Sequence, residues 1–179
     1  MLRLRPYKPS DAACLLRWLT DEKTVAFWKA DRFQWPLTKE QLAQYHRDFE
    51  SDPNAMAFTA LNENGGPAGH FSLRKIDWKE NRGHMGFIVV DPETRGKGYG
   101  RRMVHLALTY AFEVLGLKAV TLGVYDCNEP ARRCYEAEGF RRIERPGFEA
   151  RTETFHGAQW EYFYLEARRD EAPQTDREK

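Results

Sequence analysis

Apolar and polar positions alternate along several short stretches of this chain, and the alternation predicts β-strands. Leu2 and Leu4 alternate with arginines and are followed by Pro6, which predicts a short first strand. The turn-forming residues at 62–67 predict a hairpin between two further stretches of this kind. The strands predicted after the first one cover residues 56–61, 69–76, 84–90, 120–125, 140–143 and 160–165.

Apolar residues three and four positions apart predict helices between these strands. Two helices are expected before residue 56: Ser10 and Asp11 cap the first, and a capping box at 38–41 opens the second. A short helix is expected after Asn128, which would be its N-cap. Hairpins and crossovers together predict an α+β fold on one mixed sheet. The clearest helical stripe, between Gly98 and Gly116, consists of Met103, Leu106, Ala107, Tyr110 and Val114.

The composition of the 179-residue chain is that of an ordinary globular protein with one domain. A net charge of +1 creates no global basic field, so nucleic acid is not an expected partner. No apolar run suits a signal peptide or a membrane span, and three cysteines without CxxC spacing favour free thiols. A cytoplasmic protein without a membrane partner is therefore expected. The five histidines are scattered, so no metal site is expected.

The chain is expected to divide into one domain and a tail. Residues 1–167 carry the predicted strands and helices. From Arg168 onward the sequence is charged and poor in apolar residues. Residues 168–179 are therefore predicted to be a disordered tail.

The first candidate site is the stretch 95–100, which has the sequence Arg-Gly-Lys-Gly-Tyr-Gly between a predicted strand and a predicted helix. Glycines let the backbone turn sharply and present its N–H groups. The first N–H groups of a helix have no intrahelical partner and lie at the positive end of the helix dipole, so they suit a pyrophosphate. The stretch matches neither the dinucleotide fingerprint GxGxxG nor a P-loop. On its own it is equally compatible with a simple glycine-rich turn.

The second candidate site is the pair Asn128 and Tyr135. They are seven residues apart, two helical turns, so they share one helix face. That face follows the end of the strand predicted at 120–125, and ligands in open α/β sheets bind at such strand ends. Taken singly, Tyr135 is equally compatible with a core aromatic residue and Asn128 with a helix cap.

Taken together, these motifs resemble the GNAT superfamily of N-acetyltransferases. The resemblance implies a mixed, largely antiparallel sheet with about four helices, strands that splay at the acetyl-CoA site, and acetyl-CoA as cosubstrate. The opening of the chain, with Arg5-Pro6 and Ser10-Asp11, further resembles the branch that holds ribosomal-protein-alanine and polyamine acetyltransferases. The motifs that carry the family resemblance are Val89-Val90-Asp91-Pro92, the stretch 95–100, and Asn128-x-x-Ala131-x-x-x-Tyr135-x-x-x-Gly139-Phe140.

The resemblance implies a role for each matching residue. Tyr135 would donate a proton to the departing CoA thiolate, which is chemically sensible because a phenol is protonated at neutral pH. A backbone N–H near Val89 would stabilise the oxyanion. Asn128 would orient the pantetheine or the splayed strand. The cofactor-binding set implied by the family consists of Ile88, Val89, Val90, Arg95, Gly96, Lys97, Gly98, Tyr99, Gly100, Arg101 and Asn128.

The general base is where the sequence departs from the family pattern. Many relatives carry Glu where this chain has His84. Histidine titrates near neutrality, so His84 is the predicted acceptor of the amine proton, directly or through water. A strand residue without proton chemistry is the alternative. His70 and Glu153 are weaker candidates because no motif places them.

The acceptor is expected to bind near an aromatic segment between the first two predicted helices. Phe27, Trp28 and Trp35 are the predicted substrate contacts, since aromatic rings surround cations or apolar groups. Contacts in the core or in a dimer are the alternative for these rings. The acceptor is expected to be a small amine: a polyamine, an amino acid or an aminoglycoside-like molecule. Two alternatives stay open, an acetyltransferase for a protein N-terminus or lysine and a CoA-binding module without catalysis. Because dimers are common in such families, the resemblance also allows a homodimer.

Overall fold

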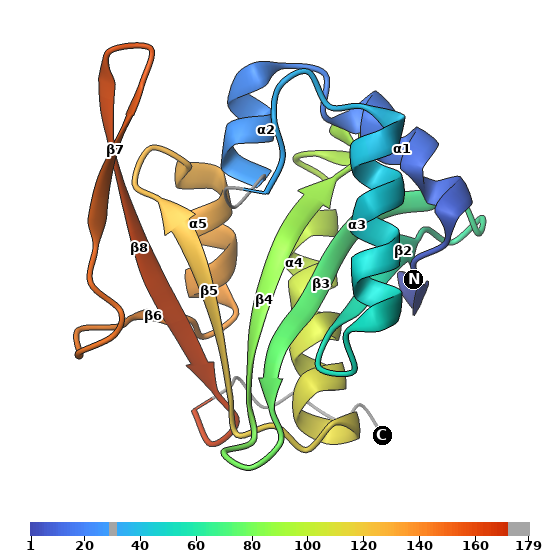
Figure 1. The fold of residues 1–179 in the computed structure, drawn as a ribbon. Coiled ribbons are helices and arrows are strands. Elements are labelled where there is room, and N and C mark those ends of the chain that lie inside the picture. Colours follow the sequence, from blue (N-terminus) through green and yellow to red (C-terminus); the bar gives the residue numbers. More distant parts are fainter. Residues whose placement is uncertain (29–31, 172–179) are drawn as a thin grey trace.

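An eight-stranded sheet forms the centre of the molecule (Figure 1). The computed structural model describes residues 1–28 and 32–171. The strands lie in the order β1-β2-β3-β4-β5-β8-β6, and β7 pairs with β8. Every pair is antiparallel except β4 with β5, so the predicted mixed, largely antiparallel sheet is confirmed. The strands are β1 (Arg3–Pro6), β2 (Met56–Leu61), β3 (Pro67–Asp77), β4 (Arg82–Val90), β5 (Ala119–Tyr125), β6 (Arg141–Arg142), β7 (Arg151–Phe155) and β8 (Ala158–Arg168).

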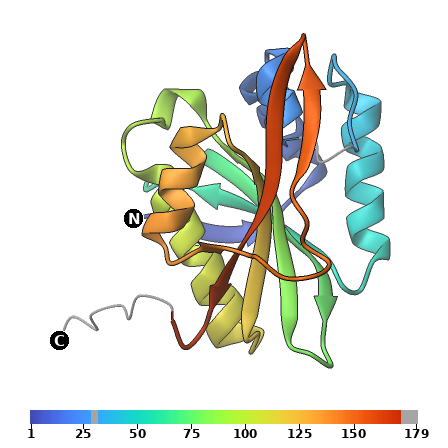
Figure 2. The same cartoon turned by 90° about the vertical axis from the view of Figure 1, so that its left-hand side faces the viewer.

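Five α-helices flank the sheet in the described part of the chain, one more than the prediction of about four. Because helices cover both faces of the sheet, the molecule has two main apolar cores, one on each face. α4 buries Met103 and Val104 against the strands, and α1 to α3 form the second core with Phe87 and Val89 of β4. The two layers of helices lie on opposite sides of the sheet (Figure 2). The helices are α1 (Ala12–Trp18), α2 (Glu22–Trp28), α3 (Lys39–Ser51), α4 (Tyr99–Thr109) and α5 (Glu129–Ala137).

The helix missing from the prediction is α2, which contains Phe27 and Trp28. We expected both residues in a connection between two helices, and this was wrong. With seven residues, α2 is too short for an apolar stripe to repeat. Its start is nevertheless signalled in the sequence, because the Asp21 carboxylate accepts hydrogen bonds from the Thr24 N–H (2.8 Å) and hydroxyl (2.6 Å).

The C-terminal strands also differ from the prediction. β7 was missed because its side chains are mostly exposed, so no apolar alternation marks it. β8 continues to Arg168, which lies opposite Ala119 on β5. The tail predicted from 168 therefore begins inside a strand, and its residues 172–179 lie outside the described residues.

Residues 1–28 and 32–171 contain neither a membrane-spanning helix nor a cluster of metal-binding side chains. No helix there is long and apolar enough to cross a membrane. No group of three or more His, Cys, Asp and Glu side chains there is arranged to hold a metal ion.

Of two predicted helix caps, one forms a side-chain hydrogen bond and one does not. The Thr38 hydroxyl accepts the predicted bond from the Gln41 N–H at 3.2 Å, whereas Asn128 makes no capping bond with its side chain.

Asp11 joins the first strands instead of capping α1 as predicted. Its side chain makes no cap hydrogen bond. The carboxylate accepts two bonds from the Arg5 guanidinium (2.6 and 2.7 Å) and one from the Thr59 hydroxyl (2.7 Å). A further bond comes from the Lys8 N–H at 2.9 Å. Burial favours the neutral acid, but these four bonds outweigh it and lower the pKa of Asp11.

Replacing Asp11 with asparagine is expected to reduce the free energy of unfolding by about 2 kcal/mol at pH 7, since charge-assisted bonds to a buried carboxylate are lost. Arg5 is partly exposed, which keeps the loss below that of a fully buried ion pair. Folding lowers the pKa of Asp11. The contribution of this carboxylate to the free energy of unfolding is therefore present above the pKa of the unfolded chain and is lost as the pH falls below about 4. Urea unfolding at pH 7 and in this acidic range measures both effects. A difference between the two proteins that is the same at all pH values would contradict the explanation.

Candidate active site

The parallel strands β4 and β5 separate along their length. They pair only at their N-terminal ends, where His84 lies opposite Thr121 as the last pair. Beyond it, β4 continues to Val90 and β5 to Tyr125 without hydrogen bonds between them. The splayed strands implied by the family resemblance are thus present. The separated half of β4 presents backbone N–H and C=O groups that an extended ligand can pair with.

A β-bulge reorients β4 at the point where the splay opens. The register against β3 shifts between His70 and Ser72, and Phe87 has a left-handed φ of 51°. Before the bulge, Met85 faces the core under α4, whereas Phe87 and Val89 face the core under α1 to α3. A left-handed conformation at a bulky residue costs free energy, so the strain is concentrated at this position. Residues 86–88, at the bulge, line the cleft.

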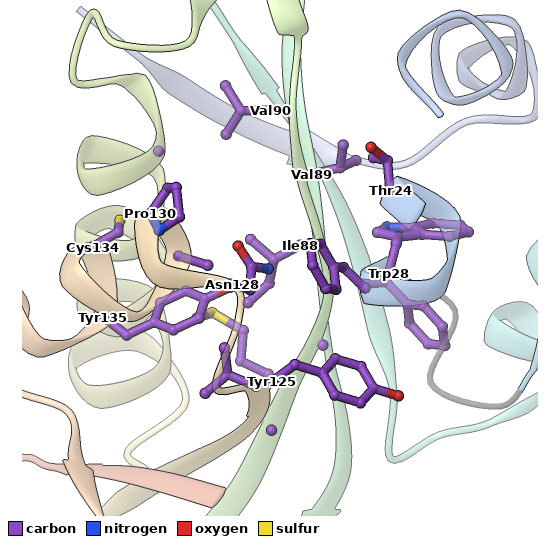
Figure 3. Close-up of a pocket in the computed structure, with 18 of the residues that line it drawn as sticks. Thr24, Trp28, Ile88, Val89, Val90, Tyr125, Asn128, Pro130, Cys134 and Tyr135 are labelled. Atoms are coloured by element: carbon purple, nitrogen blue, oxygen red, sulfur yellow. The ribbon is translucent and has the colours of Figure 1, made fainter. Parts of the chain in front are cut away.

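A cavity of about 480 Å³ fills the cleft and extends from α5 to α2. Figure 3 shows β4 in the middle, with Tyr135 and Asn128 on one side and Trp28 on the other. Most of the predicted site residues meet here although they come from four elements. Those in the wall of the cavity are Phe27, Trp28, His84, Ile88, Val89, Val90, Arg95, Gly100, Asn128 and Tyr135.

The remaining predicted residues do not line this cavity. The Tyr99 hydroxyl donates to Glu63 (3.0 Å), and Arg101 pairs with Glu138 at 2.6 Å. Their side chains are therefore held by the protein. The Trp35 side chain is 42% exposed and lies outside the cavity, so the structure does not support it as a contact of a substrate bound there. Gly96, Lys97 and Gly98 form the loop that precedes α4, in which the Lys97 N–H already donates to the Thr94 carbonyl at 3.3 Å.

The backbone of the glycine-rich loop has the geometry of an anion site. Gly98 is the N-cap of α4 with a left-handed φ of 77°, a conformation that favours glycine. The first bond of the helix runs from the Arg102 N–H to the Gly98 carbonyl. The N–H groups of residues 99–101 precede this bond and are not used within the helix. They lie at the positive end of the helix dipole.

Tyr135 is buried in the wall of the cavity, with 7% of the residue exposed. Burial raises the pKa of its phenol, so the hydroxyl keeps its proton throughout the neutral range. No hydrogen bond from this hydroxyl to any described residue is present, so it is available to a ligand. The Asn128 side chain makes no capping hydrogen bond, and it projects from the start of α5 toward Ile88 (Figure 3).

Residues 14–140, which hold most of this cavity, match the model of the acetyltransferase (GNAT) family. The chain belongs to the GNAT family. It is therefore an N-acetyltransferase, and acetyl-CoA is its acetyl donor. The cavity suits that donor, because it combines an unpaired edge of β4 with free N–H groups at α4 and a protonated phenol.

Individual GNAT proteins resemble this chain along most of its length. Spermidine N(1)-acetyltransferase of Escherichia coli strain K12 is 26% identical over 139 residues, which is 78% of this chain and 72% of that protein. An N-acetyltransferase 9-like protein of Caenorhabditis briggsae is 22% identical over 151 residues, or 78% and 74% of the two chains. Spermidine N-acetyltransferase of Vibrio cholerae, solved with CoA and spermine, superposes with a TM-score of 0.80 at 20% identity, over 95% of this chain and 96% of that one. This likeness confirms the GNAT fold.

His84 was predicted to titrate near neutrality and act as the GNAT base, and its surroundings contradict the first of these expectations. Burial and the nearby cations Arg74 and Lys75 lower its pKa to about 3. Its Nδ1 lies 3.0 Å from the Thr121 hydroxyl, which donates to the Gly83 carbonyl (3.3 Å). That arrangement assigns the imidazole proton to Nδ1 and leaves Nε2 as an acceptor. His84 is thus a neutral, weakly basic group in the wall of the cavity.

The wall of the GNAT cavity also contains residues that no motif pointed to. Tyr125 and Tyr162 contribute aromatic rings, and Arg74 contributes a guanidinium group. The one trace of Tyr162 in the sequence is Gly123 on the neighbouring strand. Only glycine fits there, because a Cβ at this position would lie 1.7 Å from the Tyr162 hydroxyl. Neither of the two weaker base candidates lines the cavity. His70 is buried with its Nε2 2.8 Å from the Tyr45 hydroxyl, and Glu153 lies behind Tyr125, whose hydroxyl donates to it at 2.5 Å.

Proposed function

We propose that this GNAT enzyme acetylates the primary amine of a small molecule by direct attack on acetyl-CoA. The observation that carries the proposal is the single cavity of about 480 Å³ that joins the cleft beside Tyr135 to the aromatic residues of α2. A volume of this size suits a small ligand. The spermidine acetyltransferases among the relatives support an acceptor of that size.

The wall of the cavity suits a neutral amine. It contains Lys23, Arg74 and Arg95 but neither Asp nor Glu among its described residues. Nearby positive charge disfavours an ammonium ion, so an amine bound here loses its proton more readily than in water. A strong general base is therefore not required. The backbone at the bulge near Val89 stabilises the oxyanion, and Tyr135 supplies the proton to the leaving thiolate.

Thiol release from acetyl-CoA in the presence of a panel of amines tests the proposal. Small primary amines are expected to give turnover, and peptides with free N-termini or lysines are not. Turnover with peptides alone would replace the proposal with an acetyltransferase for proteins.

Replacing His84 with glutamine is expected to leave the acidic limb of the kcat/KM profile at the same pH. A group with a pKa of about 3 is already neutral there, so the limb reports on the acceptor amine instead. We expect kcat/KM to fall by no more than about tenfold, below the 10²–10⁴-fold typical of a well-matched general base. The measurement is the pH dependence of kcat/KM in both proteins. An acidic limb present in the wild type and absent from His84→Gln would restore His84 as the base.

A further inference from the structure

A second cavity of about 420 Å³ adjoins the first on the side of the acceptor. The two cavities share Arg74, His84 and Tyr162 in their walls. The second cavity lies where β4 and β5 are still paired, below the splay, and it extends to the segment that precedes β7. A molecule whose amine lies beside the splay can therefore reach into the second cavity with its other end.

Positive charge dominates the second cavity. Its described wall contains four cationic side chains, Arg74, Lys75, Arg82 and Arg151, and no Asp or Glu. Two of the four are partly neutralised from outside, because Arg82 lies 3.7 Å from Glu166 and Arg151 lies 2.7 Å from Glu153. Arg74 and Lys75 face the cavity from β3 and have no ion pair with any described residue.

Arg74 is the most unusual of these groups. Its guanidinium lies over the ring of Phe87 at 4.9 Å, and its Nε is buried without a hydrogen-bond partner among the described residues. Burial, and to a smaller extent the charge of Arg32, lower its pKa. A half-buried cation without an anion is costly, and a carboxylate from a ligand would relieve that cost.

We propose that Arg74 and the second cavity bind an anionic group of the acceptor, so that the substrate is a small primary amine carrying a carboxylate, an amino-acid-like molecule and not a polyamine. This inference rests on the proposed function, since it identifies the class of acceptor for the same site. Arg74 lies opposite His84 in the register of β3 and β4, and His84 opens to both cavities. The carboxylate and the amine of one small molecule therefore reach the two cavities together. A polyamine would bring several positive charges to a wall that is already cationic.

Matched substrates test this class. Glycine, β-alanine, 4-aminobutyrate and methionine are each compared with their own amide, and spermidine is added to the panel. For the chain length that fits, the carboxylate is expected to exceed its amide by about 10- to 100-fold in kcat/KM, as for a hydrogen bond to a charged group. Arg74→Met is expected to remove this preference, mainly through KM, while the affinity for CoA is retained. Arg133→Met, at an exposed arginine of α5, is the control and is expected to keep it.

The outcomes separate the two proposals. If no amine is acetylated, the proposed function fails. If spermidine and the amides are acetylated as well as the carboxylates, the proposed function stands and the anionic class is overturned. If Arg74→Met does not fold, inhibition of the wild type tests the same inference. Butyrate, which has a carboxylate but no amine, is expected to compete with the acceptor. Butanamide, its uncharged counterpart, is expected not to compete. Equal inhibition by both would also overturn the inference.

Discussion

Replacing Tyr135 with phenylalanine is expected to lower kcat by about 10²–10⁴-fold, the range typical of general acid catalysis. The ring and its packing on Phe140 are kept, and only the hydroxyl is removed. Because the raised pKa keeps the phenol protonated, the hydroxyl is a donor throughout the neutral range. KM for acetyl-CoA is expected to change little, since proton donation to the leaving thiolate strengthens in the transition state. Steady-state kinetics with a good acceptor provides the measurement.

Tyr7→Phe is the matched control for this substitution. Tyr7 is as buried as Tyr135, its hydroxyl is buried without a hydrogen-bond partner among the described residues, and it lies outside the cavity. Its replacement is expected to leave kcat unchanged. A folded Tyr135→Phe enzyme with kcat within about twofold of the wild type would exclude proton donation, provided that single-turnover kinetics shows chemistry and not product release to be limiting.

The placement of the glycine-rich stretch, Asn128 and Tyr135 beside the cleft was predictable because it depends on local sequence. The stretch 95–100 needs glycines for its turn, and Asn128 and Tyr135 need only helical spacing to share a face. These features follow from neighbours along the chain. The separation of β4 from β5 was implied by the family resemblance and not by any residue, since a splay is a property of two strands together.

The acceptor side was not predictable because it is assembled from distant strands. Burial and the charges of Arg74 and Lys75, on the neighbouring strand, set the low pKa of His84, and no pattern around His84 shows either. The bulge at Phe87 was missed because the left-handed residue is not a glycine. Phe27 and Trp28 were identified as candidates, but their helix was too short to show a period.

Replacing Gly98 with valine is expected to weaken CoA binding by at least about 100-fold. Gly98 is left-handed with a φ of 77°, which a β-branched residue adopts only at a high cost. A Cβ at this position meets no protein atom within 4 Å, so a clash inside the protein is not the cause. The loop has to rearrange, and the N–H groups of residues 99–101 then lose their alignment toward the pyrophosphate. Losing two charge-assisted hydrogen bonds accounts for an effect of this size. Calorimetry with CoA measures it.

Gly116→Val is the matched control, and it separates backbone strain from ligand binding. Gly116 also has a left-handed φ, 69°, and its Cβ would likewise meet no atom within 4 Å, but it lies beyond the C-terminal end of α4 and away from the cavity. Both substitutions therefore carry a similar strain and are expected to lower the melting temperature to a similar extent. Only Gly98→Val is expected to reduce the affinity for CoA. Unchanged affinity in a folded Gly98→Val protein would show that the loop before α4 does not hold the pyrophosphate, and equal losses in the two variants would assign the effect to stability alone.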